Sequence, residues 1–89
     1  MNLETKLTVP AQVMSRLVGD ETVLLNLETG IYFGLDGVGQ RIWDAVVEGD
    51  SLEQIAAKIV SDYDVDEAHA QADVLEFANE LVERGLLAE

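Results

Sequence analysis

One block of the sequence, residues 21–43 (ETVLLNLETGIYFGLDGVGQRIW), constrains the fold of this chain more than any other. Thr22–Leu27 is rich in β-branched and aliphatic residues, which suit a pleated, half-buried strand. Gly30 closes a short loop at the position where a three-residue hairpin needs a left-handed backbone, which glycine adopts without a steric penalty. Ile31–Leu35 then resumes an extended pattern. The block therefore predicts a β-hairpin.

The second strand of this hairpin carries apolar or aromatic groups on both sides. Because side chains alternate along a strand, Ile31, Phe33 and Leu35 share one face, while Tyr32 and Gly34 share the other. Phe33 and Tyr32 cannot both face the core unless both faces of the sheet are covered. We expect Phe33 in the core and Tyr32 on the opposite face.

The hairpin runs directly into a helix. Asp36 can cap the helix N-terminus with its side chain and Gly49 is placed to end it, which predicts a helix over residues 37–48. Its expected buried stripe consists of Val38, Ile42, Ala45 and Val46. Trp43 and Val47 lie at the margin of that stripe.

A second helix begins at Asp50 or Ser51. Ser51 and Gln54, three residues apart, form a capping box, in which each side chain satisfies a backbone N–H of the other residue. The apolar residues that follow have the spacing of one helical face: Leu52, Ile55, Ala56, Ile59, Val60 and Tyr63.

The third helix has a wider apolar surface than one buried face requires. It runs from its cap, Asp66, to Arg84, and Gly85 ends it so that Leu86 and Leu87 can fold back onto the core. Its apolar residues form two stripes, with Ala68, Ala72, Leu75 and Val82 in one, Ala70, Val74, Phe77 and Leu81 in the other, and Ala78 between them. Together the stripes cover more than half of the helix circumference. Such a helix either is buried on two sides or lends one side to a partner.

The whole chain reads as one domain over residues 1–89, with residues 1–5 frayed. Val13–Val18 is a further strand, and Lys6–Val9 is a short strand that Pro10 ends. The predicted order is three or four short strands, which form a small antiparallel β-sheet, followed by three α-helices. This order is typical of a winged-helix-like α+β domain.

The charge of the chain argues against several functions. It has 18 acidic and 5 basic residues and a net charge of −13, whereas nucleic acids and anionic membranes attract Lys and Arg. The acidic balance favours a basic partner, or serves solubility alone. The absence of cysteine removes disulfides, thiolate metal ligands and cysteine nucleophiles. No apolar run reaches the roughly 20 residues of a membrane span, and no signal peptide is visible.

No pattern of catalytic, metal-binding or phosphate-binding residues stands out. His69, the one histidine, is expected at the surface of an acidic helix. Aspartates alternate over residues 62–66 as at the start of a calcium loop, but Glu67 and Asp73 stand where an EF-hand needs Gly and Glu. The glycines between strand and helix match neither nucleotide-binding fingerprint. We expect no catalytic residue, no metal site and no cofactor.

The run LNLETGIYFGLD, residues 25–36, followed by Ile42 and Trp43, resembles the PqqD-like family. Its members are small peptide-binding domains, also called recognition elements of ribosomally synthesised and post-translationally modified peptides, and some are free-standing proteins of lasso-peptide biosynthesis. The resemblance extends over roughly residues 13–87. Much of the family has Leu-Asn at the strand-to-helix junction, where this chain has Leu35-Asp36. Because either polar residue can cap a helix, this departure leaves the expected fold unchanged.

The resemblance implies a non-catalytic protein that binds the leader peptide of a precursor and presents it to a maturation enzyme in the cytoplasm, such as a leader peptidase or a radical enzyme. In the family, the leader pairs with the outer edge of the strand corresponding to Ile31–Leu35, and its side chains enter a groove beside the last helix. The expected peptide-binding residues are Ile31, Tyr32, Phe33, Gly34 and Leu35 of the strand, Val74, Phe77, Ala78 and Leu81 of the helix wall, and Asp73, Glu76 and Glu80 of an acidic rim that favours a basic leader.

An acyl or peptidyl carrier protein is an alternative. Asp50-Ser51-Leu52 matches the motif whose serine carries phosphopantetheine at a helix start, and the size and acidity of the chain also match. The order of elements disagrees, because a carrier is a four-helix bundle and this chain begins with strands. The capping role of Ser51 also accounts for its presence. A second alternative, a winged-helix nucleic-acid binder, is disfavoured by the net charge.

Overall fold

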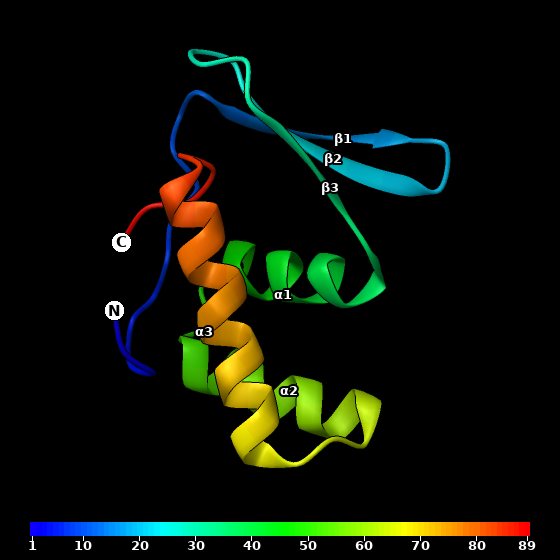
Figure 1. Ribbon diagram of the computed structural model, residues 1–89, viewed down its shortest axis with the longest axis vertical. Helices are drawn as coiled ribbons and strands as arrows, with labels where there is room; N and C mark the ends of the chain where they lie inside the picture. Colours follow the sequence, from blue (N-terminus) through cyan, green and yellow to red (C-terminus); the bar gives the residue numbers. More distant parts are fainter.

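The computed structural model describes residues 1–89, which form a three-stranded sheet on one side of three helices (Figure 1). The elements are β1 (Val13–Val18), β2 (Glu21–Asn26), β3 (Tyr32–Leu35), α1 (Gly37–Val47), α2 (Leu52–Tyr63) and α3 (Glu67–Glu83). The predicted α+β class and the order of strands and helices are confirmed. The predicted strand over residues 6–9 is wrong, because that segment forms only two isolated bridges, Lys6 with Ser51 and Thr8 with Ala88.

The sheet is antiparallel in the order β1-β2-β3, so β1 and β3 are both edge strands. The hairpin loop is longer than predicted, because β2 ends at Asn26 and β3 begins at Tyr32. The Asn26 carbonyl accepts from Gly30 N–H rather than from Ile31 N–H, so Ile31 is joined to Asn26 by one hydrogen bond only, from Asn26 N–H to the Ile31 carbonyl. Gly30 has φ +77°, as the left-handed turn position requires. None of the three helices combines the length and the apolarity that a membrane span requires.

The two faces of the sheet have different surroundings. Val13, Leu24 and Leu35 lie on the inner face and are buried against the helices. The register places eight residues on the opposite, outer face: Met14, Arg16, Val18, Glu21, Val23, Leu25, Tyr32 and Gly34. Tyr32, 72% exposed, lies on this outer face, as predicted, whereas Phe33 is only half-buried on the inner face.

All three predicted helix N-caps are confirmed. Asp36 Oδ1 accepts a hydrogen bond from Gly39 N–H at 2.7 Å, and Asp66 caps α3 in the same way. At α2, both hydrogen bonds of the Ser51–Gln54 capping box are formed. Each cap satisfies a backbone donor that the first helical turn leaves without an internal partner. These caps explain why the observed helix boundaries lie within one or two residues of the predicted ones.

The buried face of α1 differs from the prediction. Val38 is 38% exposed, and Trp43 is a core residue at 4% exposure. Gly39 takes the buried position expected for Val38, since a Cβ there would lie 3.2 Å from the Phe77 ring and 3.2 Å from Asp36 Oδ1. The N-terminus of α1 therefore approaches α3 through a glycine, which turns Val38 toward solvent.

Helix α3 buries one stripe rather than two. The stripe consists of Ala70, Val74, Ala78 and Leu81, all at most 1% exposed. Leu75, Phe77 and Val82 are half-buried beside it, and Ala68 and Ala72 are exposed. After Gly85, which has φ +72°, Leu86 and Leu87 fold back into the core as predicted.

Asn26 is a buried polar residue that ties the hairpin loop to the end of α3. Its Nδ2–H donates to the Gly85 carbonyl at 2.9 Å, and its Oδ1 accepts from the backbone N–H groups of Glu28 and Thr29. The side chain therefore satisfies its own polar atoms while joining segments far apart in the sequence. This link helps to set the position of β3 relative to α3.

Candidate functional site

The free edge of β3 exposes backbone groups that can pair with another strand. Asn26 N–H donates to the Ile31 carbonyl at 2.9 Å, and bonded and non-bonded positions alternate along an antiparallel pair. By the register, the backbone groups of Phe33 point to β2. Those of Tyr32 and Gly34 point to the open edge. Tyr32 and Gly34, on either side of Phe33, therefore have backbone groups available to an added strand.

Aromatic side chains meet between this edge and α3. Phe33 of β3 and Phe77 of α3 form an edge-to-face pair with ring centroids 6.3 Å apart. The guanidinium carbon of Arg84 lies 5.3 Å from the centroid of the Phe33 ring, within the range of a cation–π interaction. Arg84 Nε also lies 3.6 Å from Glu80 Oε1. The C-terminal end of α3 is thus held close to β3.

A hollow lies between β3, the start of α1 and α3. It has a volume of about 350 Å³ and is lined by Phe33, Gly34, Asp36, Val38, Gly39, Ile42, Asp73 and Phe77. The apolar residues can contact an aliphatic or aromatic side chain, and the two carboxylates can meet a cation or an N–H donor. This combination suits a peptide better than a purely polar ligand.

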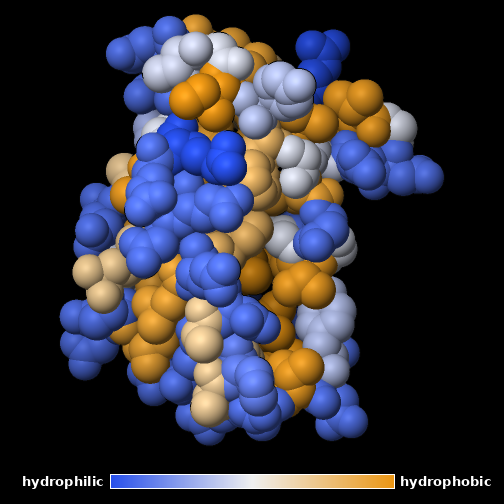
Figure 2. Space-filling model, viewed as in Figure 1, coloured by the Kyte–Doolittle hydropathy of each residue, from blue (hydrophilic) through white to orange (hydrophobic).

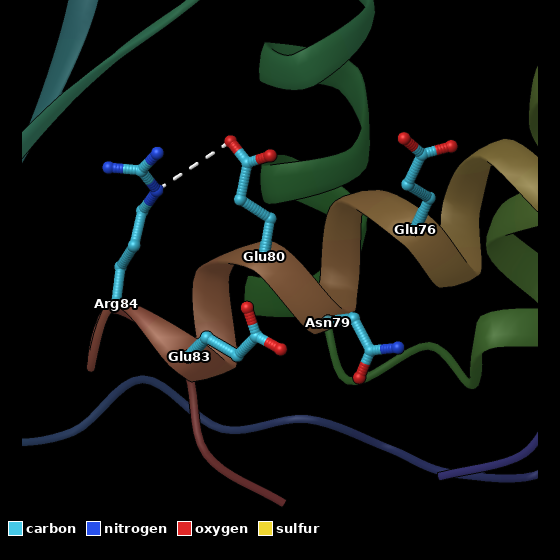
Figure 3. Close-up of a pocket in the computed structure, with 5 residues that line it drawn as sticks. All are labelled: Glu76, Asn79, Glu80, Glu83 and Arg84. Carbon is cyan, nitrogen blue, oxygen red and sulfur yellow. Dashed lines mark ion pairs between the residues drawn. The ribbon is translucent and has the colours of Figure 1, made fainter.

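A second hollow lies on the outer surface of α3 and is lined only by polar and charged side chains. Figure 3 shows Glu76, Glu80 and Arg84 on one side of the helix, in a row, with Asn79 and Glu83 on the other. Because Arg84 stacks on Phe33, this row follows the side of α3 nearest to β3. The row adds charge at the rim of the first hollow but offers no apolar contact.

The predicted site residues fall into three groups. Tyr32, Phe33 and Gly34 of the strand lie at the β3 edge, and Asp73 and Phe77 line the apolar hollow. Glu76 and Glu80 line the charged hollow on α3, which agrees with a rim position.

The remaining predicted site residues do not reach the surface of the hollows. Val74, Ala78 and Leu81 are at most 1% exposed, so the prediction that they form an open wall is wrong in this structure. They pack against the core because they lie, with Ala70, on the one face of α3 that is buried. Leu35 is also buried, and Ile31 lies in the loop before β3.

Sequence reasoning missed two parts of the site. Arg84 was treated only as the end of a helix, although it stands four residues after Glu80 and seven after Phe77, on the same helical side. That spacing could have identified it. The other missed residues are those at the start of α1, including Val38 and Gly39, and nothing in the local pattern indicated which side of α1 faces α3.

Ser51 lies at the start of α2 and is buried, with 9% of its surface exposed. Its hydroxyl accepts a hydrogen bond from Gln54 N–H as part of the capping box. A carrier protein requires an accessible serine on a helical bundle, and this serine is partly enclosed in a domain with a sheet. The structure therefore gives no support to the carrier alternative. No group of three or more His, Asp or Glu side chains is arranged to hold a metal ion.

Comparison with known proteins agrees with this architecture. The family model of coenzyme PQQ synthesis protein D (PqqD) matches residues 21–87. A solved structure described as TbiB1 in complex with the TbiA(beta) leader peptide is 42% identical, covers 89% of this chain and 92% of that chain, and has a TM-score of 0.83. A second, described as lasso peptide synthetase B1 complexed with the leader peptide, is 21% identical, covers 96% of this chain and 100% of that chain, and has a TM-score of 0.89. A search of curated protein sequences found no significant match. The family match over most of the sequence, with a 42%-identical solved relative, shows that the chain belongs to the PqqD family.

Proposed function

We propose that this chain binds the leader peptide of a ribosomally synthesised precursor, which pairs with β3 as an additional strand. The observation that carries the proposal is the free β3 edge, where the backbone groups of Tyr32 and Gly34 point outward beside the Phe33–Phe77 aromatic pair. A 42%-identical relative that was solved with a leader peptide supports the same ligand class.

Strand addition divides affinity and specificity between backbone and side chains. The outward N–H and C=O groups of β3 bond any extended peptide, and these bonds carry no sequence information. Because side chains alternate along the added strand, every second leader residue faces α3 and can enter the hollow lined by Phe33, Val38 and Phe77. The size and apolarity of that hollow select which leader residues fit.

The acidic rim favours a leader that carries Lys or Arg. Asp36 and Asp73 line the apolar hollow, and Glu76 lies farther along α3. Glu80 is partly neutralised by Arg84, which lies 3.6 Å away. Exposed charges of this kind act mainly on the association rate and on the choice of partner.

The role that follows is presentation rather than catalysis. The bound leader holds the precursor so that a separate maturation enzyme, such as a leader peptidase or a radical enzyme, acts on it in the cytoplasm. Free-standing recognition proteins of lasso-peptide biosynthesis have this role, and both similar solved structures carry leader-peptide descriptions. The domain needs no cofactor for such a role.

Amide exchange measured by NMR tests this proposal directly. Titration with the synthetic leader peptide should slow hydrogen exchange at the amides of Tyr32 and Gly34, which face the open edge. The amide of Phe33, already bonded to β2, should change much less. Equal protection of the three amides, or protection confined to α3, would count against strand addition.

A mass measurement separates this function from the carrier alternative. Incubation with coenzyme A and a phosphopantetheinyl transferase should leave the intact mass unchanged, because Ser51 is enclosed by its capping interactions. Addition of phosphopantetheine at Ser51 would favour a carrier role instead.

A further inference from the structure

The sheet has a second free edge, which β1 forms. The bond from Leu27 N–H to the Gln12 carbonyl, 2.8 Å, and the register of β1 with β2 determine which backbone groups point to β2. Because bonded and non-bonded positions alternate, the backbone of Arg16 points to β2, and those of Ser15 and Leu17 point to the open edge. No turn, loop or cap hydrogen bond uses the backbone of Ser15 or Leu17. The β1 edge therefore offers two outward-facing residues, as β3 does.

A hollow of about 570 Å³ lies beside this edge, between β1 and α1. Ser15 and Leu17 line it from the inner face of the sheet, and Val47 lines it from α1. Leu17 is 70% exposed because the β1–β2 hairpin projects past the helices (Figure 1), and Val47 is 62% exposed. Figure 2 shows hydrophobic side chains at the projecting end of this hairpin. A segment paired with β1 would therefore place its inward side chains beside Leu17 and Val47.

Nothing in β1 protects this edge from pairing. Edge strands are ordinarily blunted by proline, by bulges, by inward-pointing charges or by a covering loop. The one proline of the chain, Pro10, lies before β1, and the register with β2 is continuous along the strand. The inward side chains of Ser15 and Leu17 are uncharged. An unprotected edge beside a partly apolar hollow suits the addition of a strand.

Arg16 selects the residue that an added strand carries between its two inward side chains. Arg41, Lys58 and Arg84 each pair with a carboxylate of the chain, whereas Arg16 takes part in no ion pair. In a β-ladder, the residue opposite Arg16 has its side chain on the same face, with roughly 4.5–5.5 Å between the Cβ atoms. A carboxylate there can form a charge-assisted hydrogen bond with the free guanidinium. The favoured strand is therefore apolar, acidic and apolar at three successive positions.

A second copy of the chain and the leader peptide fit this edge less well. Two copies that paired through Ser15 and Leu17 of both would place their Arg16 side chains directly opposite each other, and like charges in that position are destabilising. The net charge of −13 also opposes self-association. The leader that suits the acidic rim beside α3 carries Lys or Arg, which Arg16 repels. The occupant that remains is an extended segment of another protein.

We propose that β1 is a second strand-addition site, which takes an extended apolar–acidic–apolar segment of a partner protein other than the leader. The inward side chains of that segment enter the hollow at α1, and its acidic side chain pairs with Arg16. Because β1 and β3 are opposite edges of the sheet, the segment and the leader can be bound at the same time. The site does not depend on leader binding, since it uses α1 rather than α3.

Two synthetic peptides test the site: Thr-Thr-Ile-Glu-Ile-Thr-Thr, and the same peptide with Lys in place of Glu. Each is titrated into isotope-labelled protein, and amide shifts and hydrogen exchange are measured by NMR. The Glu peptide should slow exchange at the amides of Ser15 and Leu17 and leave that of Arg16, bonded to β2, nearly unchanged. The Lys peptide should bind about threefold more weakly or worse. Protection at Tyr32 and Gly34 instead, no protection at either edge, or equal affinities of the two peptides would overturn the proposal.

Three variants separate the charge pair from the hollow. Arg16→Glu should reverse the preference, so that the Lys peptide binds more tightly than the Glu peptide. Val47→Ser should weaken the Glu peptide by about threefold or more and leave leader affinity within about twofold of wild type. Val38→Ser is the matched control, because Val38 is an exposed valine of the same helix that lines the leader hollow. It should leave the Glu peptide unaffected. An unchanged preference in Arg16→Glu, or equal losses of the Glu peptide in the two valine variants, would overturn the proposal.

A folding control accompanies these measurements. Circular dichroism melts establish that each variant is folded before its binding is compared. If Arg16→Glu does not fold, Ser15→Pro replaces it, because that proline removes only an N–H that faces the open edge. Ser15→Pro should lose the Glu peptide, and retained binding would overturn the proposal. So would a wild-type dimer in sedimentation that Ser15→Pro converts to a monomer, since the edge would then join two copies.

Discussion

Gly39 allows the start of α1 to approach the aromatic pair of the site. A Cβ at this position would lie 3.2 Å from both the Phe77 ring and Asp36 Oδ1, and 3.4 Å from Leu35. Gly39→Ala should therefore displace Phe77 and weaken the Asp36 cap, at a cost of about 1–3 kcal/mol in the free energy of unfolding. Leader affinity should fall as well, because Phe77 lines the apolar hollow. Urea unfolding and leader titration measure the two effects.

Gly37→Ala is the control for this prediction. Gly37 also lies in the first turn of α1, but a Cβ there has no heavy atom within 4 Å. Alanine should be neutral or stabilise the fold by up to about 1 kcal/mol, because it restricts the unfolded chain. Equal stabilities of the two variants would contradict the close packing inferred for Gly39.

His69 provides a pH-dependent contribution at the N-terminus of α3. A side-chain hydrogen bond with Asp66 raises the pKa of His69 above its ordinary value of 6.5. A raised pKa in the folded state stabilises the fold fully below the unfolded pKa, and this contribution is lost as the pH rises through the folded pKa. The free energy of unfolding should therefore decline slightly as the pH rises from below 6.5 through the raised pKa of His69. His69→Gln should remove that decline, and an identical decline in the variant would refute the assignment.

Asp66 makes a second pH-dependent contribution to stability, which is lost at acidic rather than alkaline pH. The backbone hydrogen bond from His69 lowers the pKa of Asp66 below its ordinary value of 3.8, and the side-chain bond acts in the same direction. Its contribution is therefore present above the unfolded pKa and is lost as the pH falls through the lowered pKa. The Asp66–His69 pair therefore stabilises α3 most at a pH above the ordinary pKa of Asp66, 3.8, and below the ordinary pKa of His69, 6.5.

At the scale of elements, the register of β3 makes a proline scan decisive. Proline removes one backbone N–H, which an edge strand tolerates only where that N–H faced outward. Tyr32→Pro and Gly34→Pro should stay folded and weaken leader binding by about 1–3 kcal/mol, because a backbone partner on the leader loses its bond. Phe33→Pro should unfold the hairpin, because its N–H faces β2. Circular dichroism and leader titration distinguish these outcomes.

Alanine variants are the controls for the proline scan. Tyr32→Ala and Gly34→Ala keep the backbone N–H groups, and a Cβ at Gly34 has only Glu21 Oε2 nearby, at 4.0 Å. Tyr32→Ala and Gly34→Ala should therefore bind the leader more tightly than the corresponding prolines. A folded Gly34→Pro variant with wild-type affinity would mean that the leader contacts the helix surface alone.

At the scale of the whole molecule, the net charge of −13 should steer a basic leader toward the site. Salt screens exposed charges, with a Debye length that falls from roughly 20 Å at about 20 mM to about 4 Å at about 500 mM. The association rate of a labelled leader should therefore fall strongly over that range, while the dissociation rate changes only modestly. Stopped-flow fluorescence measures both rates.

Equal changes in net charge at two positions separate local steering from the overall charge. Glu76→Gln, on α3 near the site, should slow association at low salt more than Glu53→Gln, on α2. An equal effect of the two variants would assign steering to the net charge rather than to the rim. An association rate that does not depend on salt would remove electrostatic steering altogether, without excluding strand addition.

Local interactions were sufficient to predict most of the elements. The caps at Asp36, Ser51 and Asp66 act within one helical turn, and the left-handed positions at Gly30 and Gly85 follow from the absence of a side chain. The hydrophobic periods likewise identified β1, the central hairpin and three helices. The family resemblance, which rests on this ordered combination, was confirmed over residues 21–87.

The sequence by itself determined, to within one or two residues, where the three strands of the sheet and the three helices begin and end, because those signals depend on neighbours a few residues away. Only the tertiary structure decided which stripe of α3 is buried, which backbone groups of β3 face the open edge, and that Arg84 and Phe77 meet Phe33. Each of these depends on how segments distant in the sequence pack, and several rotations of an amphipathic helix bury similar apolar areas. Contacts such as Asn26 with Gly85, and the close approach at Gly39, select one of those rotations.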